Sequence, residues 1–327
     1  MQAVLYTGTG ATQTIAVGFQ PDLVWIKSRS AATNHKLTDS VRGATKALIS
    51  NSTAAETTDT NGITAFTSNG FTLGSDSVYN TNGATYVAWC WQAGQGSTSS
   101  NTNGNVTSTV SVNASAGFSV VTYTVTSTAS MTIGHGLGVA PQLIIEKRRD
   151  SAANWDVYTA ATGNTGRLQL NSTAAFDVQA GVWNNTTPTS TVFSQQGNGT
   201  WHTVGATCVA YCWTPIAGYS AFGSYTGNGS VDGPFVYTGF RPKWVLFKIS
   251  SAAGNWFIRD TARDLYNAST SSLFPNLSDA ENPSGVSLDI LSNGFKLRTS
   301  SSGVNGSGET IIYMAYAENP FKNALAR

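Results

Sequence analysis

The chain has 327 residues, which is enough for about two domains of ordinary size or three small ones. Charged residues make up 11% of the chain, the formal net charge is +1, and Ser, Thr, Asn and Gly fill 138 positions, which predicts a surface of neutral polar groups. There is no Lys/Arg cluster to bind nucleic acid and no apolar stretch of the roughly 20 residues that cross a membrane, and the 11% aromatic content argues against disorder.

One motif occurs three times along the chain. Gly-x-x-Pro leads each time into an apolar run that ends in a lysine six residues past the proline. The prolines and lysines are Pro21 and Lys27, Pro141 and Lys147, and Pro242 and Lys248. Fourteen residues past each proline stands His35, Trp155 or Trp256. The intervals of 120 and 101 residues between the prolines predict three related units.

The first unit is predicted to span residues 1–94. A strand is expected over 23–27, a short helical turn over 38–42, and a closing aromatic strand over 86–91. Residues 95–116 are nearly all Ser, Thr, Asn and Gly, with a few valines. Two interpretations of this segment stay open: a flexible linker, or strand-forming residues tied to a neighbour.

The second unit is predicted over residues 117–217 and the third over 218–327. The second has the corresponding strands at 143–147 and 208–213. In the third, the corresponding strands lie at 244–248 and 313–316, and a short turn is expected over 260–264. All these runs are rich in Val, Ile, Thr and aromatic residues and are bounded by Gly, Asn, Pro and Ser.

The fold class that follows is all-β, with three tandem antiparallel β-sandwich-like units. Pairs such as Asn69-Gly70 and Asn293-Gly294 favour tight hairpin turns, because both residues tolerate a positive φ. Both faces of the main strands are apolar, so we expect these strands to be fully buried. The lysines that end them are expected to reach solvent, with their aliphatic stems packed on aromatic rings.

Two acid–base pairs stand at matching positions, 18 and 21 residues past the proline. They are Asp39 with Arg42 and Asp260 with Arg263, and the second unit has Thr159 and Thr162 instead. The favoured interpretation is a structural salt bridge that pins a turn. The alternative is a functional site that the middle unit has lost.

The chain shows no pattern typical of catalysis or metal binding. Cys90, Cys208 and Cys212 lie in apolar runs and are predicted to be buried free thiols, without a zinc site. His35 is predicted to be a packing or stacking ring and not a general base, and His135 and His202 are predicted to be loop or surface residues. No acid recurs in all three units. We therefore expect a protein that is not an enzyme and that needs no cofactor or metal.

The third unit, and nearly as well the first, resembles an uncharacterised repeat domain of bacteriophage tail-fibre-like and other virion proteins. The resemblance rests on Tyr225-Thr226-Gly227-Asn228-Gly229, on the run from Gly239 to Lys248, on Asn255-Trp256, and on Ser292-Asn293-Gly294-Phe295. The second unit departs from this pattern. The family has no established catalytic residues, so the resemblance implies none here.

What the resemblance implies is a structural protein of a phage particle, made in the host cytoplasm and located on the virion tail or capsid. The first hypothesis is a tail fibre or tail-tip component that recognises the host surface. The alternatives are a capsid-decorating cement protein and, more weakly, a polysaccharide-degrading enzyme. The expected partners are other virion proteins and a host glycan or surface protein, with neither nucleic acid nor membrane insertion.

Aromatic rings are the candidates for binding a glycan, because sugar rings stack on them. The candidates are His35, Trp155 and Trp256 in the repeated position and Trp183 and Trp201 in loops of the second unit. The competing interpretation is that all of them are buried core residues. A homotrimer is predicted, because phage parts follow the symmetry of their platform. A threefold ring of units within one chain is the alternative. It is disfavoured because the second unit lacks the Asp–Arg pair.

Overall fold

The computed structural model describes residues 1–196 and 202–319, and within these it is almost entirely β. Its two helices, α1 (Ser77–Asn80) and α2 (Ser302–Asn305), have four residues each. Neither they nor any other described helix could cross a membrane. The named strands pair antiparallel, so the all-β antiparallel class predicted from the sequence is confirmed.

The first third of the chain forms two sheets, and we call it unit 1 (residues 1–94). Its strands are β1 (Gln2–Thr7), β2 (Gln13–Ala16), β3 (Leu23–Ser28), β4 (Lys36–Asp39), β5 (Lys46–Ile49), β6 (Thr57–Thr58), β7 (Ile63–Thr67), β8 (Gly70–Leu73) and β9 (Thr85–Trp91). The larger sheet has the order β1-β9-β3-β4-β5-β6, and the smaller one has the order β2-β8-β7.

Unit 2 (residues 95–217) also has a large and a small sheet. Its strands are β10 (Ser99–Asn101), β11 (Ser108–Asn113), β12 (Phe118–Thr124), β13 (Ser130–Gly134), β14 (Leu143–Arg148), β15 (Trp155–Thr159), β16 (Gly163–Gln169), β17 (Asp177–Val178), β18 (Val192–Gln196) and β19 (Thr207–Trp213). The large sheet runs β10-β11-β12-β19-β14-β15-β16-β17, and β13 pairs with β18. Residues 95–116 therefore do not form a free linker, because β10 and β11 extend this sheet.

Unit 3 (residues 218–327) has two four-stranded sheets. Its strands are β20 (Ser220–Thr226), β21 (Phe235–Tyr237), β22 (Pro242–Ile249), β23 (Trp256–Asp260), β24 (Ser269–Ser272), β25 (Asn282–Leu291), β26 (Gly294–Leu297) and β27 (Thr310–Ala317). The orders are β20-β27-β22-β23 and β21-β26-β25-β24. The series β1-β9-β3-β4, β12-β19-β14-β15 and β20-β27-β22-β23 thus repeat one strand order.

Each unit has its own apolar core between its two sheets, and a fourth core lies where the units meet. Alternation along the closing strand explains this arrangement. In β9, Tyr86, Ala88 and Cys90 face the core of unit 1, whereas Val87, Trp89 and Trp91 face the shared central core. Both faces of the strand are therefore buried, as the apolar sequence predicts.

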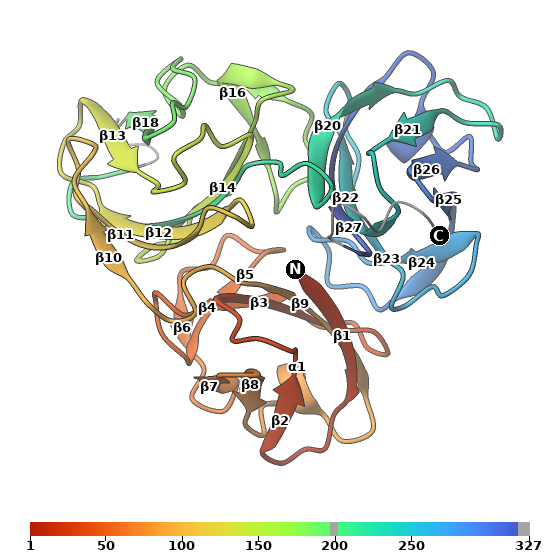
Figure 1. The fold of residues 1–327 in the computed structure, drawn as a ribbon, viewed down its shortest axis with the longest axis horizontal. Helices are drawn as coiled ribbons and strands as arrows, with labels where there is room; N and C mark the ends of the chain where they lie inside the picture. Colours follow the sequence, from red (N-terminus) through yellow and green to blue (C-terminus); the bar gives the residue numbers. More distant parts are fainter. Residues whose placement is uncertain (197–201, 320–327) are drawn as a thin grey trace.

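The central core joins all three units. Each unit contributes large aromatic side chains to it, among them Trp89 and Trp91 from unit 1, Tyr211 and Trp213 from unit 2, and Trp244 and Tyr316 from unit 3. The ring of Trp91 lies 6.1 Å from that of Trp213 and 6.3 Å from that of Tyr316, measured between centroids. Figure 1 shows the result, three lobes around a common centre, with the sheets that contain β3, β14 and β22 turned inward.

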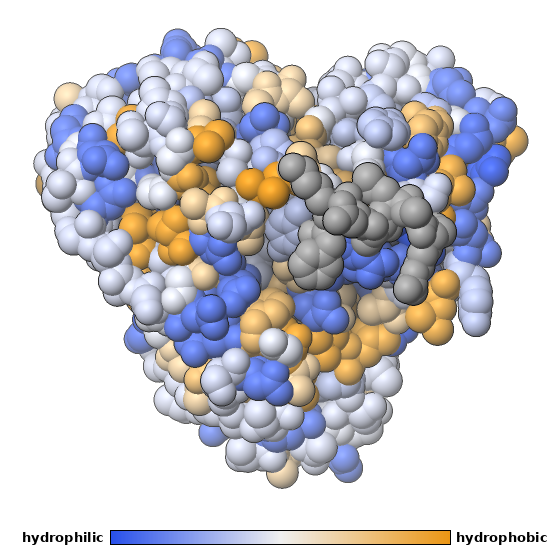
Figure 2. All heavy atoms as spheres, viewed as in Figure 1, coloured by the Kyte–Doolittle hydropathy of each residue, from blue (hydrophilic) through white to orange (hydrophobic). Residues whose placement is uncertain are grey.

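Backbone hydrogen bonds connect the units in a cycle. The amide of Glu56 donates to the carbonyl of Arg149, that of Phe176 to Ser250, and that of Glu281 to Arg29, each at 2.8 Å. These bonds join unit 1 to unit 2, unit 2 to unit 3, and unit 3 back to unit 1. The outer parts of the lobes in Figure 2 are mostly pale or blue, which fits a surface of neutral polar residues.

The three repeated lysines do not reach solvent, contrary to the prediction. Lys27, Lys147 and Lys248 have 0% exposure. The Nζ of Lys147 donates to the carbonyl of Thr53 in unit 1 at 3.0 Å, and the Nζ of Lys248 donates to that of Thr173 in unit 2 at 3.2 Å. Burial lowers the pKa of each of the three lysines to about 8. The prediction failed because the neighbouring unit covers the end of each strand.

Candidate functional site

The repeated ring position lies inside the molecule, at the boundaries between units. His35, Trp155 and Trp256 each have 0% exposure. The indole Nε1 of Trp155 donates to the carbonyl of Ile49 in unit 1 at 2.8 Å. The Nε1 of Trp256 donates to the carbonyl of Gln169 in unit 2 at 2.9 Å. The two indoles hold neighbouring units together, and the burial of all three rings does not fit the prediction that they stack on a glycan.

His35 is a neutral interior ring. The Nε1 of Trp25 donates to its Nδ1 at 2.9 Å, and an indole nitrogen can only donate. The neutral imidazole must therefore carry its proton on Nε2. The ring is stacked on Trp89, with 6.2 Å between centroids. Burial, and after it the charge of Lys27, holds the pKa of His35 well below its ordinary value.

Paired asparagines fix the loop before each of these rings. Three side-chain amides accept a hydrogen bond from the ring residue's backbone N–H at 2.8–2.9 Å: Asn51 from His35, Asn171 from Trp155, and Asn276 from Trp256. The same amides donate to the repeated asparagines Asn34, Asn154 and Asn255. The sequence indicates two of these asparagine pairs through a shared Asn-Ser-Thr-Ala-Ala run, which begins at Asn51 and at Asn171. The third was missed because its partners are 21 residues apart instead of 17.

The two predicted acid–base pairs are present and fully buried. Arg42 Nε lies 2.5 Å from Asp39 Oδ2 and Arg263 Nε lies 2.7 Å from Asp260 Oδ2. Each carboxylate also accepts a hydrogen bond from the next unit in the cycle. The donors are the hydroxyl of Tyr211 to Asp39 at 2.8 Å and the indole of Trp89 to Asp260 at 3.0 Å. The pairs therefore stabilise two unit boundaries as well as their own turns.

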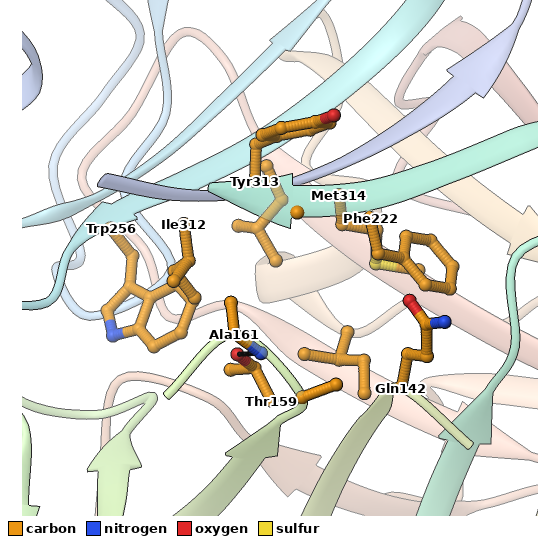
Figure 3. A pocket seen from close by; sticks show the side chains of 12 residues that line it. Gln142, Thr159, Ala161, Phe222, Trp256, Ile312, Tyr313 and Met314 are labelled. Carbon is orange, nitrogen blue, oxygen red and sulfur yellow. Dashed lines mark hydrogen bonds between the residues drawn. The ribbon is translucent and has the colours of Figure 1, made fainter. Parts of the chain in front are cut away.

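The third boundary, between units 2 and 3, replaces this pair by a small apolar cavity. Figure 3 shows Thr159 and Ala161 of unit 2 facing Trp256, Ile312 and Met314 of unit 3 across it. Its volume is about 30 Å³, which is room for one or two water molecules and not for a sugar ring. Thr159 stands here where the other boundaries have an aspartate. The divergence of unit 2 thus leaves imperfect packing and not a binding site.

A buried polar cluster distinguishes unit 2 from the other units, and it is the candidate functional site. Its members are Tyr123 on β12, Glu146 on β14, Gln195 on β18, His202 in the loop before β19, and Cys208 on β19. All five are 5% exposed or less. We call this set the polar cluster. The apolar side chains Ile26 of unit 1 and Phe247 of unit 3 occupy the strand position that corresponds to Glu146.

Hydrogen bonds converge on the carboxylate of Glu146. The hydroxyl of Tyr123 donates to its Oε1 and the amide of Gln195 donates to its Oε2. The Nε2 of His202 lies 3.1 Å from Oε1. One ligand atom each of Glu146, His202 and Cys208 lies within 4.8 Å of the other two. The cluster thus brings a carboxylate, an imidazole and a thiol together.

Charge and burial act on the cluster in opposite directions. Burial lowers the pKa of His202, but the carboxylate of Glu146 and the nearby Cys208 outweigh it, so this pKa lies well above its ordinary value. Burial raises the pKa of the Cys208 thiol, and His202 opposes this effect. Asp156, the cross-strand neighbour of Glu146, has a pKa raised to about 6 by burial, although Arg167 lies 2.6 Å away.

A pocket of about 210 Å³ opens beside the polar cluster. Glu146, Asp156, His202 and Arg148 are among the residues that line it. Sequence reasoning missed this site, because it treated Cys208 as having no nearby histidine and His202 as a loop or surface residue. His202 is in a loop but is only 3% exposed. The available signal was a glutamate directly after three apolar residues of β14, at a position that is apolar in the other units.

Of the two remaining aromatic candidates, the structure describes Trp183, and this residue lacks the predicted exposure. Trp183 is 1% exposed, and Trp201 lies outside the described residues. His135 is buried as well. Within the described part of the chain, the exposed aromatic side chains belong to unit 3: Phe235 at 45%, Tyr237 at 66% and Tyr266 at 83%. Cys90, Cys208 and Cys212 are buried free thiols, as predicted.

Comparison with known proteins gives one match. A family model described as a domain of unknown function (DUF7483) matches residues 1–320. No curated protein and no solved structure matches the chain.

Proposed function

The chain belongs to the DUF7483 family of unknown function, and from its architecture we propose that it is a non-enzymatic structural protein of a bacteriophage particle. The observation that supports this most is the use of the repeated residues. Two of the repeated lysines, Lys147 and Lys248, the two indoles and the two Asp–Arg pairs each make hydrogen bonds to a neighbouring unit. The residues that recur at matching positions in the units thus make the molecule rigid. Rigidity suits a building block of a large assembly.

We place the protein first on the tail, as a fibre or tail-tip component that contacts the host surface. The exposed aromatic side chains of unit 3, Phe235, Tyr237 and Tyr266, could stack on sugar rings there. The second candidate is a capsid-decorating protein. The three-lobed outline in Figure 1 favours it, because such a shape fits a threefold position on a shell as a single chain.

The location decides between these proposals. Particles are purified from the phage that encodes the chain, and antibody-bound gold is imaged on them. Gold on the tail supports the first proposal, and gold distributed over the shell supports the second. Particles that lack the chain by mass spectrometry would contradict both. New reducing ends after incubation with host polysaccharide would contradict the proposal that the protein is not an enzyme.

Host binding is tested with surface variants of unit 3. We expect Tyr237→Ser and Tyr266→Ser to weaken binding to host cells, because both side chains are exposed and removing them leaves the cores intact. Val139→Ser is the matched control, since Val139 is 58% exposed but lies on unit 2. Equal binding by all three variants and the unchanged protein would argue against recognition through unit 3.

A further inference from the structure

The polar cluster in unit 2 places three different metal-ligating atoms together. A carboxylate oxygen of Glu146, a ring nitrogen of His202 and the sulfur of Cys208 lie within 4.8 Å of one another. They come from β14, from a loop and from β19, so the sandwich itself holds them in place. In the other units the corresponding strand positions are apolar or aromatic. They are Ile26 and Phe247 for Glu146, and Tyr86 and Ile311 for Cys208.

The cluster has unused ligating capacity. Within the described residues, the buried Nδ1 of His202 and the buried Oε1 of Gln195 have no hydrogen-bond partner. A buried polar atom without a partner is costly, so such atoms usually mark a missing water or ion. The Glu146 carboxylate is also buried, and the nearby guanidinium of Arg167 is 2.6 Å from the carboxylate of Asp156. The ring of His202 faces the Glu146 carboxylate, and a metal cation would compensate the same charge once His202 is neutral.

We propose that Glu146, His202 and Cys208 bind one zinc ion per chain. A set of one sulfur, one nitrogen and one oxygen suits zinc, whereas calcium and magnesium prefer oxygen alone. Three protein ligands leave a fourth position of the tetrahedron open. The 210 Å³ pocket, which Glu146 and His202 line, can supply a water molecule to it. This inference is independent of the proposed location on a phage particle.

The other members of the cluster would support the ion indirectly. The hydroxyl of Tyr123 and the amide of Gln195 both donate to Glu146, which fixes the orientation of its carboxylate. Such outer contacts are a regular part of zinc sites and tune their affinity. Binding requires the thiolate of Cys208 and a neutral His202, so protons leave to the solvent as the ion enters.

The test uses the full-length chain, stripped of metal with a chelator and titrated with Co²⁺ as a coloured substitute for Zn²⁺. We expect one Co²⁺ per chain and an absorption band from charge transfer between the thiolate and the metal. Added Zn²⁺ should displace the Co²⁺ and remove the band. A wild-type chain that takes up neither ion at micromolar concentrations would overturn the proposal.

Variants show whether these residues are the ligands. Cys208→Ser should lose the thiolate band, and Glu146→Ile, which copies unit 1, should bind roughly tenfold more weakly or worse. Cys212→Ser on the same strand and Cys90→Ser in unit 1 are the matched controls and should keep both the band and the affinity. A band that survives in Cys208→Ser, or disappears in Cys90→Ser, would refute the assignment. Where a variant does not fold, the wild-type stoichiometry and band remain decisive.

Discussion

Arg42 and Arg263 occupy the same position in two units, and neither side chain is exposed to solvent. Burying a guanidinium costs several kcal/mol unless its charge is matched and its N–H groups are bonded. Arg42 meets this condition with Asp39, with Glu56 at 2.8 Å and with the carbonyl of Leu37 at 3.1 Å. The pair is therefore tolerated as a unit, and removing one member should cost more than removing both.

The first prediction tests this with residues taken from unit 2. Arg42→Thr should lower the free energy of unfolding by about 3–5 kcal/mol, because it leaves Asp39 buried without its cation. Asp39→Thr/Arg42→Thr, which copies Thr159 and Thr162, should lose less. Urea denaturation at neutral pH measures both. A double variant that is no more stable than the single one would show that the aspartate charge is not the cause.

The second prediction compares two buried indoles. Trp155→Phe should destabilise the protein by about 1–3 kcal/mol more than Trp183→Phe, because only the first removes the donor to a carbonyl, that of Ile49. Within the described residues the Nε1 of Trp183 has no partner, and its ring is just as deeply buried. Thermal unfolding followed by near-ultraviolet circular dichroism gives both values. Equal losses would show that packing alone holds Trp155.

At the scale of elements, two ion pairs reinforce the backbone hydrogen bonds that join the units. Glu56 lies 2.9 Å from Arg149 of unit 2, and Glu281 lies 2.7 Å from Arg29 of unit 1. Burial opposes ionisation of Glu56. The hydrogen bond from Arg149 and the charge of Arg42 together outweigh it, so the pKa of Glu56 lies below its ordinary value. Glu281 has a lowered pKa for the same reasons, with Arg29 and Arg263 as its partners.

The third prediction is a loss of stability in acid. The pKa of Glu56 is lower in the folded than in the unfolded chain, so its contribution is complete above the unfolded value of about 4.5. The contribution disappears as the pH falls through the folded value. Glu56→Gln should thus be less stable than wild type at pH 7 and nearly equal to it at pH 3. Glu309→Gln, at a carboxylate that accepts from Ser251 and lies outside the ion pairs between units, is the control for the glutamate-to-glutamine change itself. Parallel curves for wild type and Glu56→Gln would contradict the prediction.

The strands could be predicted from the sequence, because they depend on local composition and on a threefold repeat. Details that depend on contacts between segments distant in the sequence could not. Gly70 and Gly294 were assigned to hairpin turns through a positive φ, yet neither has one. A Cβ at Gly70 would lie 1.9 Å from the carbonyl oxygen of Ile15, and a Cβ at Gly294 would lie 2.1 Å from that of Val236. Close approach of the paired strand, β2 to Gly70 and β21 to Gly294, requires these glycines.

The polar cluster could not be predicted for the same kind of reason. Glu146 and Cys208 are 62 residues apart, on strands that pair only through the sandwich topology. His202 looked like a loop residue beside an aromatic one, and nothing local indicates that its ring turns inward. The sequence of unit 2 argues against a ring of units, because it lacks the Asp–Arg pair. The structure closes the ring without it, since Thr159, Ala161 and Met314 make an apolar boundary instead.

For the whole molecule, the shared central core makes the units depend on one another. The faces of β3 and β9 that carry Trp25, Trp89 and Trp91 would be exposed to water if unit 1 stood alone. The fourth prediction is therefore a single cooperative unfolding transition in calorimetry, with equal calorimetric and van't Hoff enthalpies. A fragment of residues 1–94 should not fold by itself. Two or three separate transitions would show that each sandwich is stable without the central core.

The fifth prediction concerns assembly. The homotrimer expected from the sequence remains a prediction, and sedimentation at micromolar concentration tests it. For a trimer, the mass obtained from sedimentation should be three times the chain mass of 34.3 kDa. A single 34.3 kDa species, with no copy of the same chain beside it on the particle, would show that the ring of units supplies the threefold arrangement alone.

The closed cycle also limits how such a chain can change in evolution. Each unit uses two different surfaces, which we call head and tail, to contact its two neighbours. A series of such head-to-tail contacts leaves no surface unpaired only when the rotation from one unit to the next closes a ring. In this chain three copies use every head and every tail. A chain with two or four copies would keep one of each unpaired, and those surfaces would bind other chains and build filaments. Copy number is thus fixed at three by geometry, and relatives should vary in the length of their outer loops and not in the number of units.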